Sequence, residues 1–155
     1  MSGAPAAAAQ AVAPVPIKMR KALADALIAK IGATAHNQLL KDFRAWVDLG
    51  PQGEDEHPVF GKDGKNRDSN VLWHVHIIPL DTAAQAQWED DFENFRKRTS
   101  DRLLFYAYDG DRIGYLLIDV IDDPNGHEIF APKNDQLRAE WQAKAEKFTT
   151  FGKLS

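Results

Sequence analysis

Two histidines at alternate positions are the residues of this sequence that most readily suggest chemistry. His74 and His76 lie within residues 71–78, where side chains alternate with the two-residue period of a strand. This period places both imidazoles on one face, with their Cα atoms about 6.7 Å apart, twice the rise of a strand residue. Such a pair can supply a general base and a general acid, or two ligands of a zinc ion, or it can be structural.

A dense group of hydrogen-bond donors stands further along the chain. Residues 95–102 read Phe-Arg-Lys-Arg-Thr-Ser-Asp-Arg and precede a predicted strand whose Tyr106 and Tyr108 share a face with Arg102. Cleavage of RNA without a metal needs a base for the 2′-hydroxyl, cations for the charge on the scissile phosphate, and an acid for the leaving 5′-oxygen. Arg98 or Arg102 suits the second of these roles.

The residues leave the other two roles open. The candidates for base and acid are one tyrosine and three histidines: Tyr106, His74, His76 and His127. Aromatic rings nearby can stack on unpaired bases. The alternative is that the arginines are a solvated entrance to the strand and the tyrosines pack in the core. The catalytic hypothesis therefore requires the imidazoles, Arg98 and Tyr106 to converge on one concave surface.

The charge distribution is uneven along the chain. A formal net charge of −4 is not typical of a protein that binds a phosphate backbone by charge alone. Cations nevertheless gather at residues 96–102 and in a loop with Lys62, Lys65 and Arg67, while acids gather elsewhere. Local basic patches on an acidic protein are compatible with contact to RNA, and the alternative is solvated loops of mixed charge.

Several classes of protein are excluded by composition and motif. The chain has no cysteine, which excludes a disulfide framework and a thiolate metal site and fits a reducing compartment. Charges interrupt every apolar run before the roughly 20 residues that a membrane span requires. There is no phosphate-binding glycine loop, metalloprotease helix motif or nucleophile elbow. We therefore expect a cytoplasmic protein with no membrane contact, no metal site and no cofactor.

The elements that must position these residues form one predicted domain. Residues 1–16 are rich in Ala and Pro and carry no charge, which predicts a disordered tail before a single domain over residues 17–155. Apolar residues at helical spacing predict two helices, over residues 17–31 and from the N-cap Thr34 to residue 49. Residues 51–70 are predicted as a long loop with at most a very short strand.

The second half of the chain predicts a β-hairpin. Residues 102–108 and 112–121 are rich in aromatic and branched side chains and are joined by Asp109-Gly110, a strong hairpin signal. The other predicted elements are an inserted helix with the capping box Thr82 and Gln85, a short extended piece around Ile129, and a final helix from about Asn134. This order predicts an α+β fold, with an antiparallel sheet of about four strands covered by helices chiefly on one face.

Several short segments, taken in order, resemble the YafO family of toxins. They are Pro58-Val-Phe-Gly-Lys-Asp63, His74-Val-His76, Phe95 with Arg98-Thr-Ser-Asp101, a long apolar strand followed by His127, and Ala145-Glu-Lys-Phe148. The resemblance covers residues 17–148, and its specificity comes from the order and spacing of the segments together. Two features depart from the family: the acidic net charge, and an Ala/Pro tail with an insertion around residues 82–91.

The resemblance implies a fold, an activity and a set of partners. YafO-like toxins are ribosome-dependent endoribonucleases that cleave mRNA and arrest translation, and a cognate antitoxin protein encoded beside each one neutralises it. They are similar to the wider RelE and ParE toxin fold. The partners implied are therefore the antitoxin, the ribosome and mRNA, with the oligomeric state left open. The alternatives are a non-catalytic module of the same fold, such as a topoisomerase inhibitor, and a metal-assisted hydrolase built on His74 and His76.

The histidine pair, the donor cluster and the resemblance together select the candidate site. The catalytic candidates are His74, His76, Arg98, Asp101 and Tyr106. The candidates for RNA contact are Lys62, Arg67, Lys97, Thr99, Arg102, Tyr108 and His127. We expect Arg98→Ala to lower cleavage about a hundredfold while the fold is preserved, which is the effect of losing one donor that stabilises developing charge.

Overall fold

The computed structural model describes most of the chain, as residues 16–49, 57–66, 69–108, 114–122 and 126–152. The tail predicted over residues 1–16 lies outside the described residues except for Pro16. The predicted boundary between this tail and a single domain over residues 17–155 stays a prediction. Arg67 and the predicted Asp109-Gly110 turn also lie outside the described residues. None of the described helices is long and apolar enough to cross a membrane.

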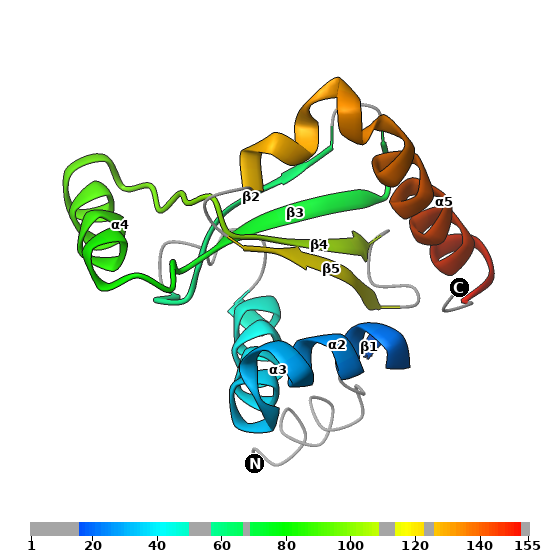
Figure 1. Ribbon diagram of the computed structural model, residues 1–155, viewed down its shortest axis with the longest axis horizontal. Helices are drawn as coiled ribbons and strands as arrows, with labels where there is room; N and C mark the ends of the chain where they lie inside the picture. The colour runs from blue at the N-terminus through cyan, green and yellow to red at the C-terminus, as the bar shows by residue number, and fades with distance from the viewer. Residues whose placement is uncertain (1–15, 50–56, 67–68, 109–113, 123–125, 153–155) are drawn as a thin grey trace, which may run out of the picture.

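A five-stranded mixed sheet lies between two layers of helices (Figure 1). Its strand order is β1-β5-β4-β3-β2, with β1 parallel to β5 and all other neighbours antiparallel. The strands are β1 (Ile17–Met19), β2 (Phe60–Lys65), β3 (Leu72–Ile77), β4 (Leu103–Tyr108) and β5 (Tyr115–Ile121). The helices are α2 (Lys21–Ile31), α3 (Ala33–Leu49), α4 (Thr82–Phe95) and α5 (Asp135–Phe151), with 3-10 turns η2 (Gly126–Phe130) and η3 (Pro132–Asn134). The predicted α+β class and the antiparallel β4–β5 hairpin are confirmed.

Each face of the sheet has its own apolar core. On the α3 face, α2 and α3 pack on a cluster that includes Phe43, Trp46, Phe60, Val75, Leu104, Tyr106 and Tyr115. On the α5 face, α5 packs on a cluster that includes Leu72, Leu103, Phe105, Leu116, Trp141 and Phe148. Side chains of β3 and β4 therefore alternate between the two cores, as the two-residue period requires.

Helix α4 stands to one side of the sheet, beyond the strand ends (Figure 1). It is held there by Trp88, which is buried and whose Nε1 donates to Pro58 O at 3.2 Å. The helix begins where Asp81 caps it, because the Asp81 carboxylate accepts from Ala84 N at 2.9 Å. Thr82 was the predicted N-cap, which is one residue after the observed cap.

Two strands differ from the predictions. Residues 17–19 were assigned to the first helix but form β1, an edge strand, and Tyr115 N donates to Pro16 O at 2.9 Å beside it. Residues 60–65 were assigned to a long loop with at most a very short strand, but they form the six-residue strand β2, and pairing with β3 holds this polar segment extended. The sheet therefore has five strands rather than about four, and one of its edges is parallel.

Two further predictions are corrected at the C-terminal end. The segment around Ile129 is the 3-10 turn η2 rather than an extended piece, and Ile129 is buried in the core of the α5 face. Helices also cover both faces of the sheet rather than chiefly one. This two-sided cover determines which side chains of the sheet stay accessible.

Candidate active site

Three imidazoles lie in a row on the α5 face of the sheet. His74 and His76 project from β3 on this face, as the alternation of the strand predicts, with ring centroids 6.1 Å apart. His127 of η2 continues the row, because its ring centroid is 6.1 Å from that of His76. Segments far apart in the sequence thus bring the three rings together.

The outermost ring, His127, is oriented by a carboxylate. Asp101 Oδ1 pairs with His127 Nδ1, and both side chains are accessible to solvent. A carboxylate on one nitrogen of an imidazole fixes the orientation of the ring and leaves Nε2 to exchange a proton. The Asp101–His127 pair therefore has the arrangement of an acid–base group and its orienting partner.

The middle ring, His76, is held by the peptide of Ser100. Its Nδ1 lies 2.9 Å from Ser100 N and 2.8 Å from Ser100 O. An unprotonated Nδ1 accepts from the N–H, and a protonated Nδ1 donates to the carbonyl, so one residue can hold either form of the ring. The Ser100 hydroxyl fixes this peptide in turn, since it donates to Ile77 O at 2.7 Å.

Opposing effects act on the His76 ring. Burial is the largest, and it lowers the pKa of His76, with the positive charges of His127 and Lys62 acting in the same direction. The Ser100 carbonyl and Asp101 oppose this shift without cancelling it. His76 is therefore neutral at pH 7 and is able to accept a proton.

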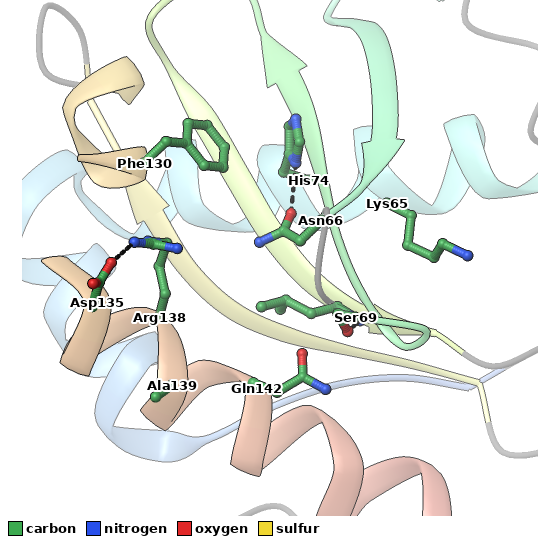
Figure 2. A pocket seen from close by; sticks show the side chains of 10 residues that line it. Lys65, Asn66, Ser69, His74, Phe130, Asp135, Arg138, Ala139 and Gln142 are labelled. Atoms are coloured by element: carbon green, nitrogen blue, oxygen red, sulfur yellow. Dashed lines mark hydrogen bonds and ion pairs between the residues drawn. The ribbon is translucent and has the colours of Figure 1, made fainter. Parts of the chain in front are cut away.

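The innermost ring, His74, is bonded to an amide (Figure 2). Its Nδ1 lies 2.8 Å from Asn66 Oδ1, and because that oxygen can only accept, Nδ1 carries the proton and Nε2 the lone pair. Burial, and then the nearby His76, His127 and Lys62, lower the pKa of His74 to about 4. His74 is thus a neutral ring across the physiological range.

An open cavity of about 320 Å³ lies beside the three rings. We call it the imidazole cavity, and its lining is Lys62, Asp63, Gly64, His74, His76, Thr99 and His127. Lys62 is exposed and brings a cation to the cavity from β2. The cavity therefore combines proton-transfer groups with a positive charge.

Two glycines allow the segment before β4 to approach this cavity closely. A Cβ on Gly61 would clash with Arg98 O, and one on Gly126 would clash with Asp101 O. Lys62 N also donates to Arg98 O at 2.9 Å. Since any larger residue at Gly126 would displace the Asp101 backbone, this glycine positions the carboxylate that orients His127.

The comparison with protein families agrees with the sequence resemblance. The family model described as Toxin YafO, type II toxin-antitoxin system, matches residues 44–150, which is more than half of the chain. The chain belongs to the YafO family of type II toxins. No curated protein and no solved structure matches the chain. As a type II toxin, this YafO-family member has a cognate antitoxin as its partner.

The family match covers every residue of the imidazole cavity. It begins within α3 and ends within α5, so it includes β2 to β5 and η2 but not β1 and α2. Of the predicted site residues, the structure brings six together around the cavity: Lys62, His74, His76, Thr99, Asp101 and His127. The contributions of Asn66 and the Ser100 peptide were not predicted, because neither residue type stands out in the sequence.

Arg98 does not line the imidazole cavity of this YafO toxin. The residue is 8% exposed and its Nε pairs with Glu89 at 3.1 Å. Its Nη1 donates to His57 O at 3.2 Å, and its guanidinium lies 3.7 Å from the centre of the Phe92 ring. These contacts join α4 to the sheet, which is a structural role.

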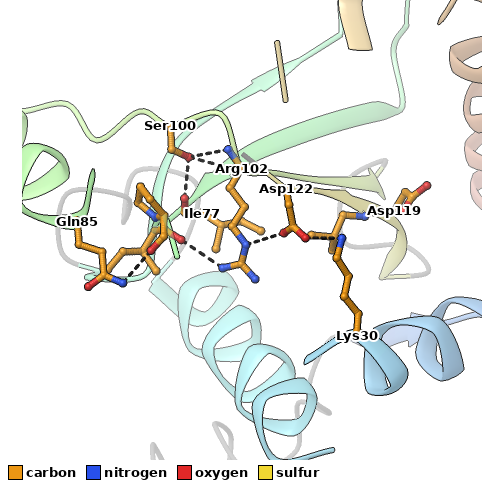
Figure 3. Close-up of polar contacts among 10 residues, drawn as sticks. Lys30, Ile77, Gln85, Ser100, Arg102, Asp119 and Asp122 are labelled. Atoms are coloured by element: carbon orange, nitrogen blue, oxygen red, sulfur yellow. Dashed lines mark hydrogen bonds and ion pairs between the residues drawn. The ribbon is translucent and has the colours of Figure 1, made fainter. Parts of the chain in front are cut away.

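Arg102 is also committed to structural contacts, on the α3 face (Figure 3). Its Nε pairs with Asp122 at 3.1 Å and its Nη1 donates to Ile78 O at 3.2 Å. Lys30 of α2 pairs with the same carboxylate. Burial raises the pKa of Asp122, but the hydrogen bonds from Lys30 and Arg102 outweigh it, so that the pKa is lowered overall.

The two predicted tyrosines lie on the face opposite the imidazoles. Tyr106 is 2% exposed, its hydroxyl donates to Asp63 Oδ2 at 3.3 Å, and burial raises its pKa well above the usual value. Tyr108 stacks on Tyr115 with ring centroids 4.4 Å apart. The predicted convergence of Tyr106 and Arg98 with the histidines is therefore not found. Lys97 is exposed and does not line the cavity.

The alternative of a metal site on His74 and His76 needs a third ligand. Within the part of the chain that the structure describes, no three His, Asp or Glu residues are grouped so that they could hold a metal ion. His74 Nδ1 and His76 Nδ1 are bonded to an amide and a peptide instead. The geometry thus favours proton transfer over metal binding.

Proposed function

We propose that this toxin is a metal-independent endoribonuclease of the cytoplasm that cleaves mRNA on the ribosome. The observation that supports this most directly is the row of His74, His76 and His127 beside Lys62 at one open cavity. Two imidazoles and a cation are the groups that cleavage through the 2′-hydroxyl requires. The dependence on the ribosome comes from the family resemblance.

In the proposed reaction, His76 is the base. With Nδ1–H donating to Ser100 O, its Nε2 takes the proton of the 2′-hydroxyl while the 2′-oxygen attacks the adjacent phosphorus. The charge that develops on the phosphate is balanced by Lys62. Burial keeps His76 unprotonated at pH 7, which is the state that a base needs.

His127 is the acid of this reaction. Its Nε2–H protonates the 5′-oxygen as the bond from phosphorus to that oxygen breaks, and the Asp101 carboxylate balances the charge of the protonated ring. The products are a 2′,3′-cyclic phosphate and a 5′-hydroxyl end. After the products leave, His76 gives its proton to water and His127 takes one up from water, which restores both rings.

In this proposal the ribosome supplies the affinity for the message that an acidic protein lacks. A net charge of −4 gives weak attraction to free RNA, so docking on the ribosome provides most of the affinity and presents the message in a strained geometry. The basic residues of the toxin then need only to position the scissile phosphate, while His76 and His127 transfer the protons. The same reasoning predicts little cleavage of naked RNA.

The test is primer extension on a message incubated with ribosomes and purified toxin. We expect His76→Gln and His127→Gln each to lower the cleavage rate by roughly 10²–10⁴-fold with an unchanged melting temperature. His36→Gln, on α3 and away from the cavity, is the matched histidine control. A single 2′-deoxy substitution at the cut position should abolish cleavage.

Three outcomes would contradict the proposal. Undiminished cleavage by both histidine variants would remove the imidazoles from the mechanism, and cleavage at the deoxy position would exclude attack by the 2′-hydroxyl. Intact translation together with DNA damage signalling, after induced expression, would favour the alternative of topoisomerase inhibition.

A further inference from the structure

A second and larger cavity adjoins the imidazole cavity. Its volume is about 630 Å³, and it lies between the end of the β2–β3 pair and the first half of α5 (Figure 2). His74 lines both cavities, so the two meet at this ring. A volume of this size is within the range of sites for small organic molecules, roughly 300–1,000 Å³.

One wall of the larger cavity is an accessible aromatic ring. Phe130 of η2 is 40% exposed although it is large and apolar. Its ring centroid lies 5.3 Å from that of His74 and 6.1 Å from that of Phe105, so packing fixes the ring at the cavity edge. A fixed ring with an open face is a surface on which a planar heterocycle can stack.

The other walls provide directed polar groups. Asn66 Oδ1 is bonded to His74, and Figure 2 shows the amide nitrogen turned into the cavity, toward the side formed by Arg138. The Arg138 guanidinium is held by Asp135 and by Ala131 O at 3.5 Å, so it is oriented in advance. Gln142 of α5 adds a second amide to the lining.

The chemistry of these walls selects one class of ligand. A guanidinium and an amide nitrogen are donors that match the paired acceptors N7 and O6 of guanine, and one of the two can also donate to N7 of adenine. An apolar ring supplies the stacking surface but does not discriminate between bases by itself. The combination suits a flat heterocycle with acceptors along one edge.

We propose that the larger cavity binds a purine base of the nucleotide beside the scissile phosphate and so gives the toxin a base preference at the cut. This inference rests on the proposed function, because a base in the larger cavity lies across the shared His74 from a sugar-phosphate in the imidazole cavity. Phe130 stacks on the base, and Arg138 and the Asn66 amide recognise its edge.

Nucleotide binding tests the cavity without any cleavage. The probes are 3′-GMP, 3′-AMP, 3′-CMP and 3′-UMP, titrated into the full-length protein while backbone amide NMR shifts are followed. We expect the two purine nucleotides to shift the amides of Ala139 and Gln142 and to bind more tightly than the pyrimidines. Phe130→Ala should weaken purine binding about tenfold or more, whereas Phe95→Ala, which removes an exposed ring of α4, should not.

Cleavage mapping provides the second measurement. Primer extension over a message with varied sequence should show purine enrichment beside the cuts made by the wild type and a loss of that enrichment with Phe130→Ala. An unchanged base distribution at the cuts made by Phe130→Ala would overturn the proposed base site. Equal binding of all four nucleotides would overturn it as well, and so would shifts of the Ala139 and Gln142 amides that occur only when the antitoxin is added. Purine binding without any RNA cleavage by the wild type would instead overturn the proposed function and leave the base site standing.

Discussion

The two faces of the sheet are built from the same strands but differ in how completely helices cover them. On the α3 face, helices α2 and α3 close over the strands, and most of the aromatic rings there are buried in one core. On the α5 face, α5 covers the strands only in part, and cavities remain where β2 and β3 present their polar side chains. The comparison teaches that helix cover, rather than residue type alone, determines which side chains of a strand are available for chemistry.

The largest loss of stability is expected from a truncation in the core of the α3 face, which we call the closed face; the α5 face is then the open face. Phe43 is fully buried, with the rings of Trp46, Phe60, Tyr106 and Tyr115 around it. Phe43→Ala leaves a cavity in this core and should lower the free energy of unfolding by about 3–5 kcal/mol, measured by urea denaturation. Phe95→Ala, the exposed counterpart, should change it by less than about 0.5 kcal/mol. Equal effects of the two variants would contradict the assignment of this face as the main core.

Substitution of Arg98 is expected to have the next largest effect on stability. It tests whether this residue is structural or belongs to the site on the open face. The sequence predicts a hundredfold loss of cleavage by Arg98→Ala with an intact fold, whereas its buried contacts predict a loss of stability. Because His57 O would lose its donor, we expect the free energy of unfolding to fall by roughly 1–3 kcal/mol, with cleavage per folded molecule unchanged. Lys97→Ala, one residue away and exposed, is the control. A fully stable variant with a hundredfold loss of cleavage would return Arg98 to the mechanism.

The pH dependence of stability reports the imidazoles of the open face. His74 has a pKa of about 4 when folded against the usual 6.5, so between these values the unfolded chain binds a proton that the folded chain does not. Stability is therefore full above about pH 6.5 and falls as the pH decreases toward 4, and the lowered pKa of His76 acts in the same direction. We expect the urea midpoint to fall between pH 7 and 5, and His74→Gln to reduce that slope. Identical slopes would contradict the burial of the ring.

The smallest effect is expected from Tyr106→Phe. The hydroxyl makes a long hydrogen bond to Asp63, at 3.3 Å, on the closed face. Its loss should change the free energy of unfolding by less than about 1 kcal/mol and the cleavage rate by less than about twofold. A hundredfold slower cleavage by a stable Tyr106→Phe variant would show that the tyrosine reaches the substrate.

Local patterns were sufficient to predict the parts of the fold that follow a regular period. The alternation in β3 predicted the shared face of His74 and His76, and the aromatic strands predicted the β4–β5 hairpin. Residues 17–19 and 60–65 could not be assigned in this way. The first strand is too short to have a period, and the second is polar, so each depends on a partner strand elsewhere in the chain.

The candidate site was predicted in residue type but not in arrangement. His127 and Asp101 were both selected, yet their pairing depends on the fold of η2 against the segment before β4. Arg98 and Arg102 were expected at the surface because charged residues usually lie there, and only tertiary contacts reveal that both are buried in ion pairs. A sequence therefore identifies the chemical groups more readily than the direction in which they face.

The parallel pairing of β1 with β5 joins segments that are synthesised far apart in time. Ile17 pairs with Tyr115, and His127 comes still later in the chain, so neither the sheet edge nor the imidazole row can form while the polypeptide is only partly synthesised. We expect a nascent chain to be harmless to the ribosome that is translating it. The delay is a property of the topology, and under the proposed function it keeps the site incomplete until synthesis of the chain is nearly finished.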